Sequence, residues 1–203
     1  LIGLVLGLVL LQPDMGTAVV ILSEALAIYF LSGANVLYLS LLVPLLAFLG
    51  FIVIKISPYR AKRLESFLNI NQSLESSSYH VKQILIALGV GGLTGVGLGN
   101  SLQKYAYLPE STTDSIFAII AEELGLIGSL FVVGLFLALC HTLVTIAKRS
   151  GDRFGRLYVL GVAVWITAQA FVNMAAVSGV APLTGLPLPF ISYGGTAMIT
   201  LLA

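Results

Sequence analysis

The chain has 203 residues, of which 58% are hydrophobic and 9% are charged, and its formal net charge is +1. Soluble domains carry about a quarter charged residues, so the composition excludes an ordinary soluble domain and gives no sign of a nucleic-acid partner. The single cysteine, Cys140, excludes an intrachain disulfide, and the two histidines lie too far apart in sequence to suggest a metal site. The sequence predicts an all-α, polytopic membrane protein.

Apolar runs suited to spanning helices, which need about 20 residues, indicate about six spans in a single transmembrane domain over 1–203. The chain opens inside an apolar run without an initiator methionine and stops inside another, so we expect a fragment cut within a span at each end. The first run covers 1–11, complete spans are expected at 17–31, 36–56, 116–147 and 157–181, and the last run follows 195.

A large loop is predicted at 57–115, between two of the spans. Within it, the run 83–99 is apolar but short and rich in glycine. Irregular backbone is tolerated at membrane depth where protein surrounds it. We therefore expect this run to lie at the interface or to fold back against protein, rather than to span.

Orientation follows from the short loop 148–156, which carries Lys148, Arg149, Arg153 and Arg156 against one acid. Short loops rich in Lys and Arg face the cytoplasm. Counting spans outward then places the turn 32–35 inside. The same count places three unusual polar or Pro/Gly segments on the outer face, namely 12–16, 57–115 and 182–195.

The remaining basic residues gather at or in the predicted outer loop, where the outer leaflet offers no obvious reason for them. One use is an anionic ligand such as a phosphate, which Arg binds as a fork and Lys as a point charge. The alternative is a solvated stretch whose side chains snorkel at the headgroups. These residues are Lys55, Arg60, Lys62, Arg63, Lys82 and Lys104.

Four carboxylates, Glu110, Asp114, Glu122 and Glu123, lie close together near the end of this loop. Asp114 follows two threonines, and a helix cap and a catalytic acid or base are equally good interpretations of it. For a helix that starts near Asp114, Glu122 and Glu123 lie about 12 Å further along. Carboxylates at or inside the membrane boundary are costly and are functional candidates.

Three further features stand out from the apolar background. Asp14 follows Pro13 and either caps the span 17–31 or belongs to a site, while Glu24 is a lone acid that we expect to face the bundle. The segment 182–195 breaks the backbone in the way that lines a cavity; the alternative is a rigid loop without a ligand. The break is carried by Pro182, Gly185, Pro187, Pro189, Gly194 and Gly195.

Four blocks together resemble one family: "QPDMGTA" (12–18), "PYRAKRLESFLN" (58–69), "GVGLGNSLQKYAYLPESTTDSIFAIIAEELGLIG" (95–128) and "PLTGLPLPFISYGG" (182–195). In this order they resemble the SEDS family (FtsW/RodA/SpoVE; shape, elongation, division and sporulation), and most closely its division branch. The resemblance implies a bundle of ten spans, of which this chain is similar to spans five to ten. The predicted loop matches the family's large extracytoplasmic loop.

The family polymerises lipid II into the glycan strands of bacterial peptidoglycan. The resemblance therefore implies a hexosyltransferase-type glycosyltransferase in the bacterial cytoplasmic membrane, with its active site on the extracytoplasmic face. The essential aspartate of the family motif matches Asp114, which implies a catalytic base. The other predicted site residues are the substrate-binding Arg60, Lys62, Arg63, Gln103, Lys104 and Glu110, with Pro13, Asp14, Pro187, Pro189, Gly194 and Gly195 as a structural motif nearby.

The resemblance also implies partners and a cofactor. The expected partners are lipid II, a class B penicillin-binding transpeptidase and other divisome proteins, and a divalent cation, Mg²⁺ or Mn²⁺, is expected to stabilise the pyrophosphate leaving group. The chain departs from the family's "HTD" motif, with Thr112 and Thr113 before Asp114 and Ser115 after it. Two alternative functions stay open: a lipid II flippase, which needs no base, and a division scaffold.

Overall fold

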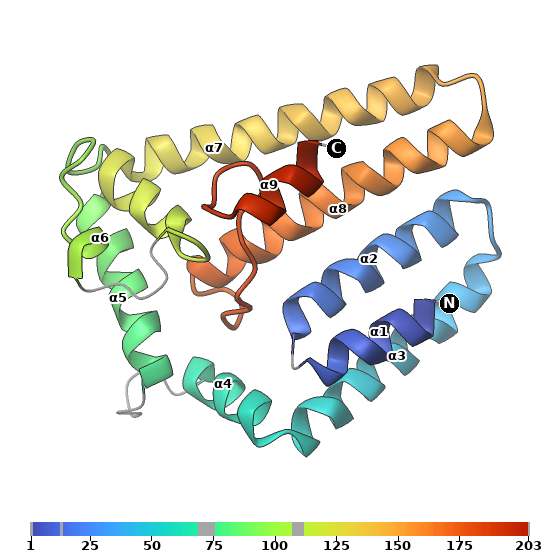
Figure 1. Ribbon diagram of the computed structural model, residues 1–203, viewed down its shortest axis with the longest axis horizontal. Coiled ribbons are helices and arrows are strands. Elements are labelled where there is room, and N and C mark those ends of the chain that lie inside the picture. The colour runs from blue at the N-terminus through green and yellow to red at the C-terminus, as the bar shows by residue number, and fades with distance from the viewer. Residues whose placement is uncertain (1, 13, 69–75, 107–111, 203) are drawn as a thin grey trace. The chain divides into compact units, whose positions relative to one another are not determined.

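The computed structural model describes residues 2–12, 14–68, 76–106 and 112–202, and in these ranges it contains nine helices and no strand (Figure 1). The chain divides into two compact units. One comprises Leu1–Glu65 with Cys140–Ala168, and the other comprises Ser66–Leu139 with Gln169–Ala203. The prediction of an all-α protein is confirmed.

Three helices in the described ranges are long and apolar enough to cross a membrane: α3 (Val36–Ile56), α7 (Ile116–Arg149) and α8 (Arg153–Val177). Two shorter helices, α1 (Ile2–Leu11) and α2 (Met15–Leu31), are also apolar. The bounds of α3 are those predicted, and α7 begins at the predicted residue. These helices make the chain a multi-pass membrane protein.

The start of α2 in the first unit is set by Asp14. The Oδ1 atom of Asp14 accepts a hydrogen bond from the Thr17 backbone N–H at 3.0 Å, and Oδ2 accepts one from the Thr17 hydroxyl at 2.6 Å. A side-chain oxygen that pairs with a free N–H of the first turn is a helix cap. The helix therefore begins at Met15, two residues before the predicted start, and Asp14 has the cap role that the sequence left open.

Glu24 lies further along α2 and is half-buried. It faces α8 within the same unit, because a side chain added at Gly161 would come within 3.6 Å of its Oε1 atom. This orientation agrees with the expectation that Glu24 faces other helices.

The turn between α7 and α8 is shorter than predicted. Asp152 accepts hydrogen bonds from the Gly155 backbone N–H at 3.0 Å and from the Ser150 hydroxyl at 3.1 Å. The bond from Gly155, followed by that from Ser150, lowers the pKa of Asp152 below its usual value. Because Asp152 caps the helix, α8 begins at Arg153 rather than 157, and it ends at Val177 rather than 181. The predicted basic loop 148–156 is therefore wrong in extent.

The segment 57–115, which the sequence predicts as a large loop, is partly helical in its described residues. It contains α4 (Pro58–Leu68), α5 (Ser76–Gly91) and the short α6 (Gln103–Ala106). The glycine-rich run 83–99 divides at Gly91: its first half is the end of α5, and its second half is an irregular loop. Four glycines of that loop have positive φ, a conformation open to glycine at no steric cost; they are Gly92, Gly95, Gly97 and Gly99.

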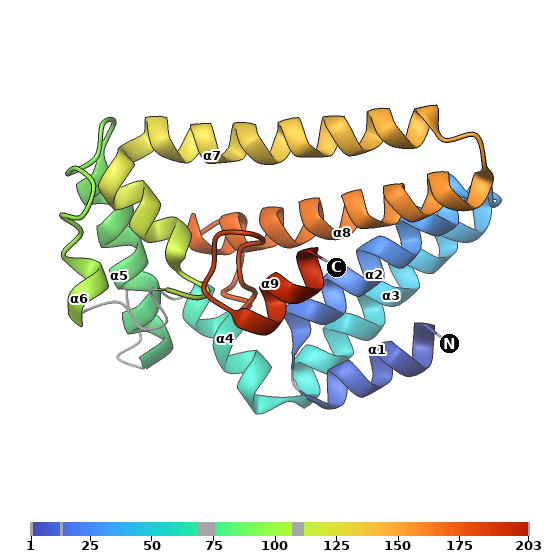
Figure 2. The ribbon, with the colours of Figure 1, turned by 45° about the horizontal axis from the view of Figure 1, so that its top comes forward.

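A break in α7 at Gly125, with φ 67° and ψ −163°, bends the helix close to α5, as Figure 2 shows. The loop 92–97 lies against the break and completes its hydrogen bonding. Val96 and Gly97 donate to the carbonyls of Glu122 and Glu123 at 3.0 Å each, and Leu126 and Ile127 donate to those of Gly92 and Leu93 at 2.9 and 3.2 Å. The predicted unbroken span 116–147 is therefore two helical pieces joined at a glycine.

The Pro/Gly segment follows α8 in the second unit and leads into α9 (Gly195–Leu202). The first turn of α9 includes a hydrogen bond from the Met198 N–H to the Gly194 carbonyl at 3.0 Å. Gly194 and Gly195 therefore form the start of the last helix.

Candidate active site

Asp114 lies on a turn just before α7, and its side chain is half-buried. The helix begins at Ile116, and the carbonyl of Ser115 accepts a hydrogen bond from the Ala118 N–H at 2.9 Å. Ser115 therefore occupies the position directly before the helix, and Asp114 lies one residue outside it. The catalytic role of Asp114 stays a prediction at this point.

Three consecutive carbonyls of this turn are held by residues of α8 and the Pro/Gly segment. The Thr112 carbonyl accepts from the Tyr193 backbone N–H at 2.9 Å. The Thr113 carbonyl accepts from the Ser192 hydroxyl at 2.6 Å, and the Asp114 carbonyl accepts from Asn173 Nδ2 at 2.8 Å. The backbone that carries the carboxylate is therefore fixed on both sides of Asp114.

The same polar side chains also hold the Pro/Gly segment. Asn173 Nδ2 donates to the Leu186 carbonyl at 2.6 Å, and Ser192 Oγ accepts from the Leu188 N–H at 2.6 Å. Gln169 Nε2 donates to the Pro187 carbonyl at 2.9 Å. The structure therefore brings Pro187, and the buried Pro189 two residues later, to the Asp114 turn.

Gly185 lies directly beside the carboxylate. Its φ is +75°, and a Cβ atom placed on it would stand 3.3 Å from Asp114 Oδ2. Glycine at this position lets the backbone approach the acid closely, in a conformation that other residues rarely adopt.

His80 on α5 joins the site from a third direction. Its Nε2 atom lies 2.8 Å from the Ser115 hydroxyl, next to Asp114 in the chain. The pair ties α5 to the start of α7. The sequence showed His80 only as one of two distant histidines, and its place beside the turn depends on the tertiary fold.

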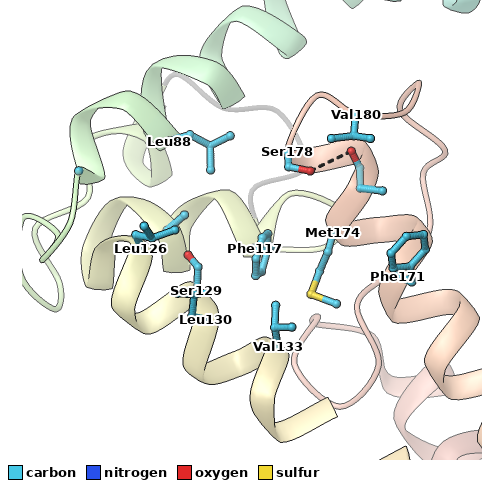
Figure 3. Close-up of a pocket in the computed structure, with 13 residues that line it drawn as sticks. Leu88, Phe117, Leu126, Ser129, Leu130, Val133, Phe171, Met174, Ser178 and Val180 are labelled. Atoms are coloured by element: carbon cyan, nitrogen blue, oxygen red, sulfur yellow. Dashed lines mark hydrogen bonds between the residues drawn. The ribbon is translucent and has the colours of Figure 1, made fainter. Parts of the chain in front are cut away.

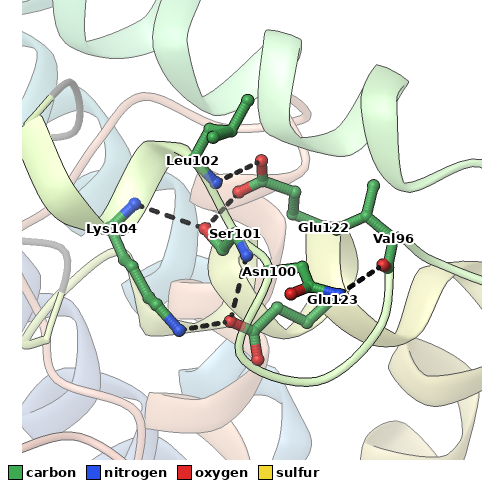
Figure 4. A network of polar contacts seen from close by, with 7 residues as sticks. All are labelled: Val96, Asn100, Ser101, Leu102, Lys104, Glu122 and Glu123. Atoms are coloured by element: carbon green, nitrogen blue, oxygen red, sulfur yellow. Dashed lines mark hydrogen bonds and ion pairs between the residues drawn. The ribbon is translucent and has the colours of Figure 1, made fainter.

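Glu122 and Glu123 hold the segment 101–104 against α7, as Figure 4 shows. Glu122 is 1% exposed and accepts hydrogen bonds from the Ser101 hydroxyl and, at 3.2 Å, from the Leu102 N–H. Glu123 Oε1 accepts from Lys104 Nζ at 2.8 Å and from the Ser101 N–H at 3.4 Å. These contacts give both carboxylates a structural account, and they engage Lys104, which was predicted to bind substrate.

The other predicted substrate-binding residues are placed as follows. Arg60, in the first unit, donates from Nη2 to the Leu10 carbonyl at the end of α1, at 2.6 Å, and Arg63 lies on the same helix, α4. Gln103 is buried, and its Oε1 atom has no hydrogen-bond partner among the described residues. Pro13, Glu110 and the side chain of Lys62 lie outside what the structure describes.

The described residues do not form a metal-binding cluster. Within those ranges no three His, Cys, Asp or Glu side chains lie together in a way that could hold a metal ion. The expected divalent cation therefore stays a prediction, with no set of ligands assigned to it among these residues.

An apolar cavity of about 480 Å³ lies in the second unit between α5, α7 and α8 (Figure 3). Phe117, three residues after Asp114 in the chain, lines it together with Leu88, Leu130, Phe171 and Met174. The lining is almost entirely hydrocarbon, so the cavity suits an apolar ligand.

A family model described as "Cell cycle protein", that of FtsW, RodA and SpoVE, matches residues 1–203. The chain belongs to the FtsW/RodA/SpoVE family. The resemblance seen in the four sequence blocks is thereby confirmed.

Two curated relatives show the degree of similarity within the FtsW/RodA/SpoVE family. The "Probable peptidoglycan glycosyltransferase FtsW" of Coxiella burnetii (strain RSA 493 / Nine Mile phase I) is 45% identical over 202 residues, covering 98% of this chain and 54% of the relative. "Stage V sporulation protein E" of Bacillus subtilis (strain 168) is 39% identical over 196 residues, covering 96% and 53%. The chain spans about half the length of these relatives.

Two solved structures share the fold. One, titled "Structural coordination of polymerization and crosslinking by a peptidoglycan synthase complex", has a TM-score of 0.74 and 29% identity, covering 98% of this chain and 55% of that chain. The other is a mutant of the rod-shape-determining protein RodA of Thermus thermophilus, with a TM-score of 0.64, 30% identity, and coverage of 98% and 50%. The helical architecture of the family therefore holds for this chain.

Proposed function

We propose that this chain carries the active site of a peptidoglycan glycosyltransferase that polymerises lipid II during bacterial cell division. The observation that carries the proposal is Asp114, held on a turn with its flanking carbonyls bonded and Gly185 beside its carboxylate. Relatives named peptidoglycan glycosyltransferase FtsW support the reaction class.

In the proposed reaction, the 4-hydroxyl of an acceptor GlcNAc attacks C1 of the donor MurNAc. The new glycosidic C–O bond forms as the bond from C1 to undecaprenyl pyrophosphate breaks. The attacking hydroxyl loses its proton, which the Asp114 carboxylate accepts as a general base. The pyrophosphate leaves with the electron pair of the broken bond.

Negative charge on the leaving pyrophosphate is proposed to be stabilised by cations of the predicted basic cluster. The candidates are Arg60, Lys62, Arg63 and Lys104, and the amide of Gln103 and the carboxylate of Glu110 are proposed to orient sugar hydroxyls. In the structure Arg60 and Lys104 already hold Leu10 and Glu123. Mg²⁺ or Mn²⁺ stays a prediction, which polymerisation with and without EDTA checks.

The apolar cavity beside Phe117 supports a place for part of the undecaprenyl chain. Its lining includes Phe117, three residues after Asp114 in the chain. A lipid tail that lies there would keep the sugar end of the substrate at the Asp114 turn. Since the tail would move from bilayer hydrocarbon to protein hydrocarbon, the contact would act by positioning the substrate rather than by the hydrophobic effect.

We place the protein in the bacterial cytoplasmic membrane, with Asp114 on the extracytoplasmic side. The basic residues near the turn between α7 and α8 support this orientation. A class B penicillin-binding transpeptidase and other divisome proteins are the proposed partners. Support comes from the similar solved structure, whose title joins polymerization with crosslinking in one complex.

The test is polymerisation of purified lipid II by the full-length protein with its transpeptidase partner. Asp114→Asn removes the base and is expected to lower kcat by about 10²- to 10⁴-fold. The matched control is Asp152→Asn, which changes an exposed carboxylate in the turn between α7 and α8. It is expected to leave the rate unchanged.

Each alternative function gives a different result in this test. Normal polymerisation by a folded Asp114→Asn protein would show that Asp114 is not the base. A wild-type protein that makes no polymer would contradict the glycosyltransferase proposal. Lipid II transport without polymer would then indicate a flippase. A scaffold would be indicated by a protein that tolerates changes at Asp114 and loses its function when its lipid-facing helix surfaces are altered.

A further inference from the structure

We propose that Asn173 and Ser192 are positioning residues, which set the direction of the Asp114 side chain for proton transfer. This inference rests on the proposed function, in which Asp114 is the base. It concerns two neutral side chains that lie on separate elements, α8 and the Pro/Gly segment.

Both side chains bridge the same two stretches of backbone. Asn173 Nδ2 donates to the carbonyls of Asp114 and Leu186, at 2.8 and 2.6 Å. Ser192 Oγ donates to the Thr113 carbonyl and accepts from the Leu188 N–H, both at 2.6 Å. Each side chain thus joins the Asp114 turn to the segment 186–188.

The two bonds to the turn act on the two peptide planes that flank Asp114. The Thr113 carbonyl belongs to the plane before the Asp114 Cα atom, and the Asp114 carbonyl belongs to the plane after it. Because each peptide unit is planar, holding both planes fixes φ and ψ of Asp114. The direction of its Cα–Cβ bond is fixed with them, which limits the carboxylate to the positions that its side-chain rotamers reach from that bond.

The burial of Asn173 argues against a role in packing alone. The side chain is 2% exposed, and its Oδ1 atom has no hydrogen-bond partner among the described residues. An unpaired buried polar atom is unfavourable, and an apolar residue of the same shape would avoid this cost. The amide instead uses Nδ2, which donates to two carbonyls at the site, those of Asp114 and Leu186.

A misplaced carboxylate has a large kinetic consequence. A displacement of about 1 Å in a reacting group lowers the rate by about 100-fold. Without the Asn173 or Ser192 bond, one peptide plane beside Asp114 loses a hydrogen bond that holds its orientation. The expected loss is therefore in kcat, because the groups that bind lipid II are unchanged.

The experiment measures kcat and KM for lipid II polymerisation by the full-length protein with its partner. Asn173→Leu and Ser192→Ala are each expected to lower kcat by about 100-fold with KM and the folded fraction unchanged. Ser192→Thr keeps a hydroxyl and is expected to retain most of the activity. Thr167→Val, a polar-to-apolar change elsewhere on α8, is the matched control and is expected to behave as wild type.

A double variant tests whether Asn173 acts through Asp114. Asp114→Asn combined with Asn173→Leu is expected to retain the same residual rate as Asp114→Asn alone, since residues that act as a unit are not additive. A further loss of similar size in the double variant would show an independent role and overturn the inference.

Three other outcomes also contradict the positioning role. They are a normal kcat in Asn173→Leu, a rise in KM that accounts for the whole loss of kcat/KM, and a Ser192→Thr protein as inactive as Ser192→Ala. These failures differ from failure of the proposed function. With Asp114→Asn inactive and Asn173→Leu normal, only the positioning role is wrong. An active Asp114→Asn protein would show that Asp114 is not the base, and the positioning role would be wrong as well.

Discussion

Gly185 lies beside the Asp114 carboxylate and leaves little room for a larger side chain. A Cβ atom there would lie 3.3 Å from Asp114 Oδ2, and the φ of +75° is strained for any other residue. We expect Gly185→Ala to lower kcat for polymerisation by about 100-fold through displacement of the carboxylate. Steady-state kinetics on lipid II measure the effect.

The control for this change is Gly50→Ala on α3, where an added Cβ meets no atom within 4 Å. It is expected to polymerise lipid II at the wild-type rate. A Gly185→Ala protein with normal kcat would show that the close approach of Gly185 to the Asp114 carboxylate has no part in catalysis.

For individual residues, the sequence predicted Asp114 as the base but did not predict the residues that hold its turn. Asp114 was found because it lies in a motif of a known family. Asn173, Ser192 and Gln169 were missed because they are uncharged and their partners are distant in sequence. One signal was present: Gln169 and Asn173 are four residues apart in an uncharged span, and this spacing places them on one helical face.

Among the helices, α7 departs most from a simple span. The backbone groups at its break near Gly125 find hydrogen-bond partners because the loop 92–97 lies directly against the helix. A Cβ atom on Gly125 would collide with Gly95 N and would lie 2.6 Å from the Leu93 carbonyl oxygen. We therefore expect Gly125→Ala to separate the loop from the helix and to lower the thermal stability and folded yield, as measured by melting and size-exclusion chromatography.

Gly134→Ala on the same helix is the matched control, since an added Cβ there meets no atom within 4 Å. Alanine favours a helix over glycine by about 1 kcal/mol, so this variant is expected to melt at the wild-type temperature or slightly above it. Equal stability in the two variants would contradict the account of the break.

The length of the apolar runs predicted α3 at its observed bounds, because that run is uniformly apolar and Asn35 caps the helix. It also predicted the residue at which α7 begins. The same criterion could not find the break, since the residues around Gly125 are apolar and its cause is a loop some 30 residues earlier. Nor did it find α4 and α5, which are too short for spans. Glu122 and Glu123 looked like site residues because their partners, Ser101 and Lys104, were unknown.

For the molecule as a whole, the positions of the basic residues predict how it is inserted. Lys148, Arg149, Arg153 and Arg156 flank the turn between α7 and α8, and such clusters are retained in the cytoplasm. Reporter fusions after Ala34 and Asp152 are therefore expected to report the cytoplasm, and a fusion after Val90 the outer side. An outer signal at Asp152 would invert the orientation and place Asp114 in the cytoplasm.

The break in α7 at Gly125, whose hydrogen bonds the loop 92–97 completes, has a consequence for membrane insertion. In hydrocarbon, each backbone group without a partner costs several kcal/mol, and the break leaves Glu122, Glu123, Leu126 and Ile127 dependent on the loop 92–97. That loop leaves the ribosome before α7 does, so its amides and carbonyls are already present when the helix enters the bilayer. The order of synthesis therefore makes the loop 92–97 before the helix that depends on it. In a circular permutant that made α7 first, we expect α7 to insert into the membrane less efficiently.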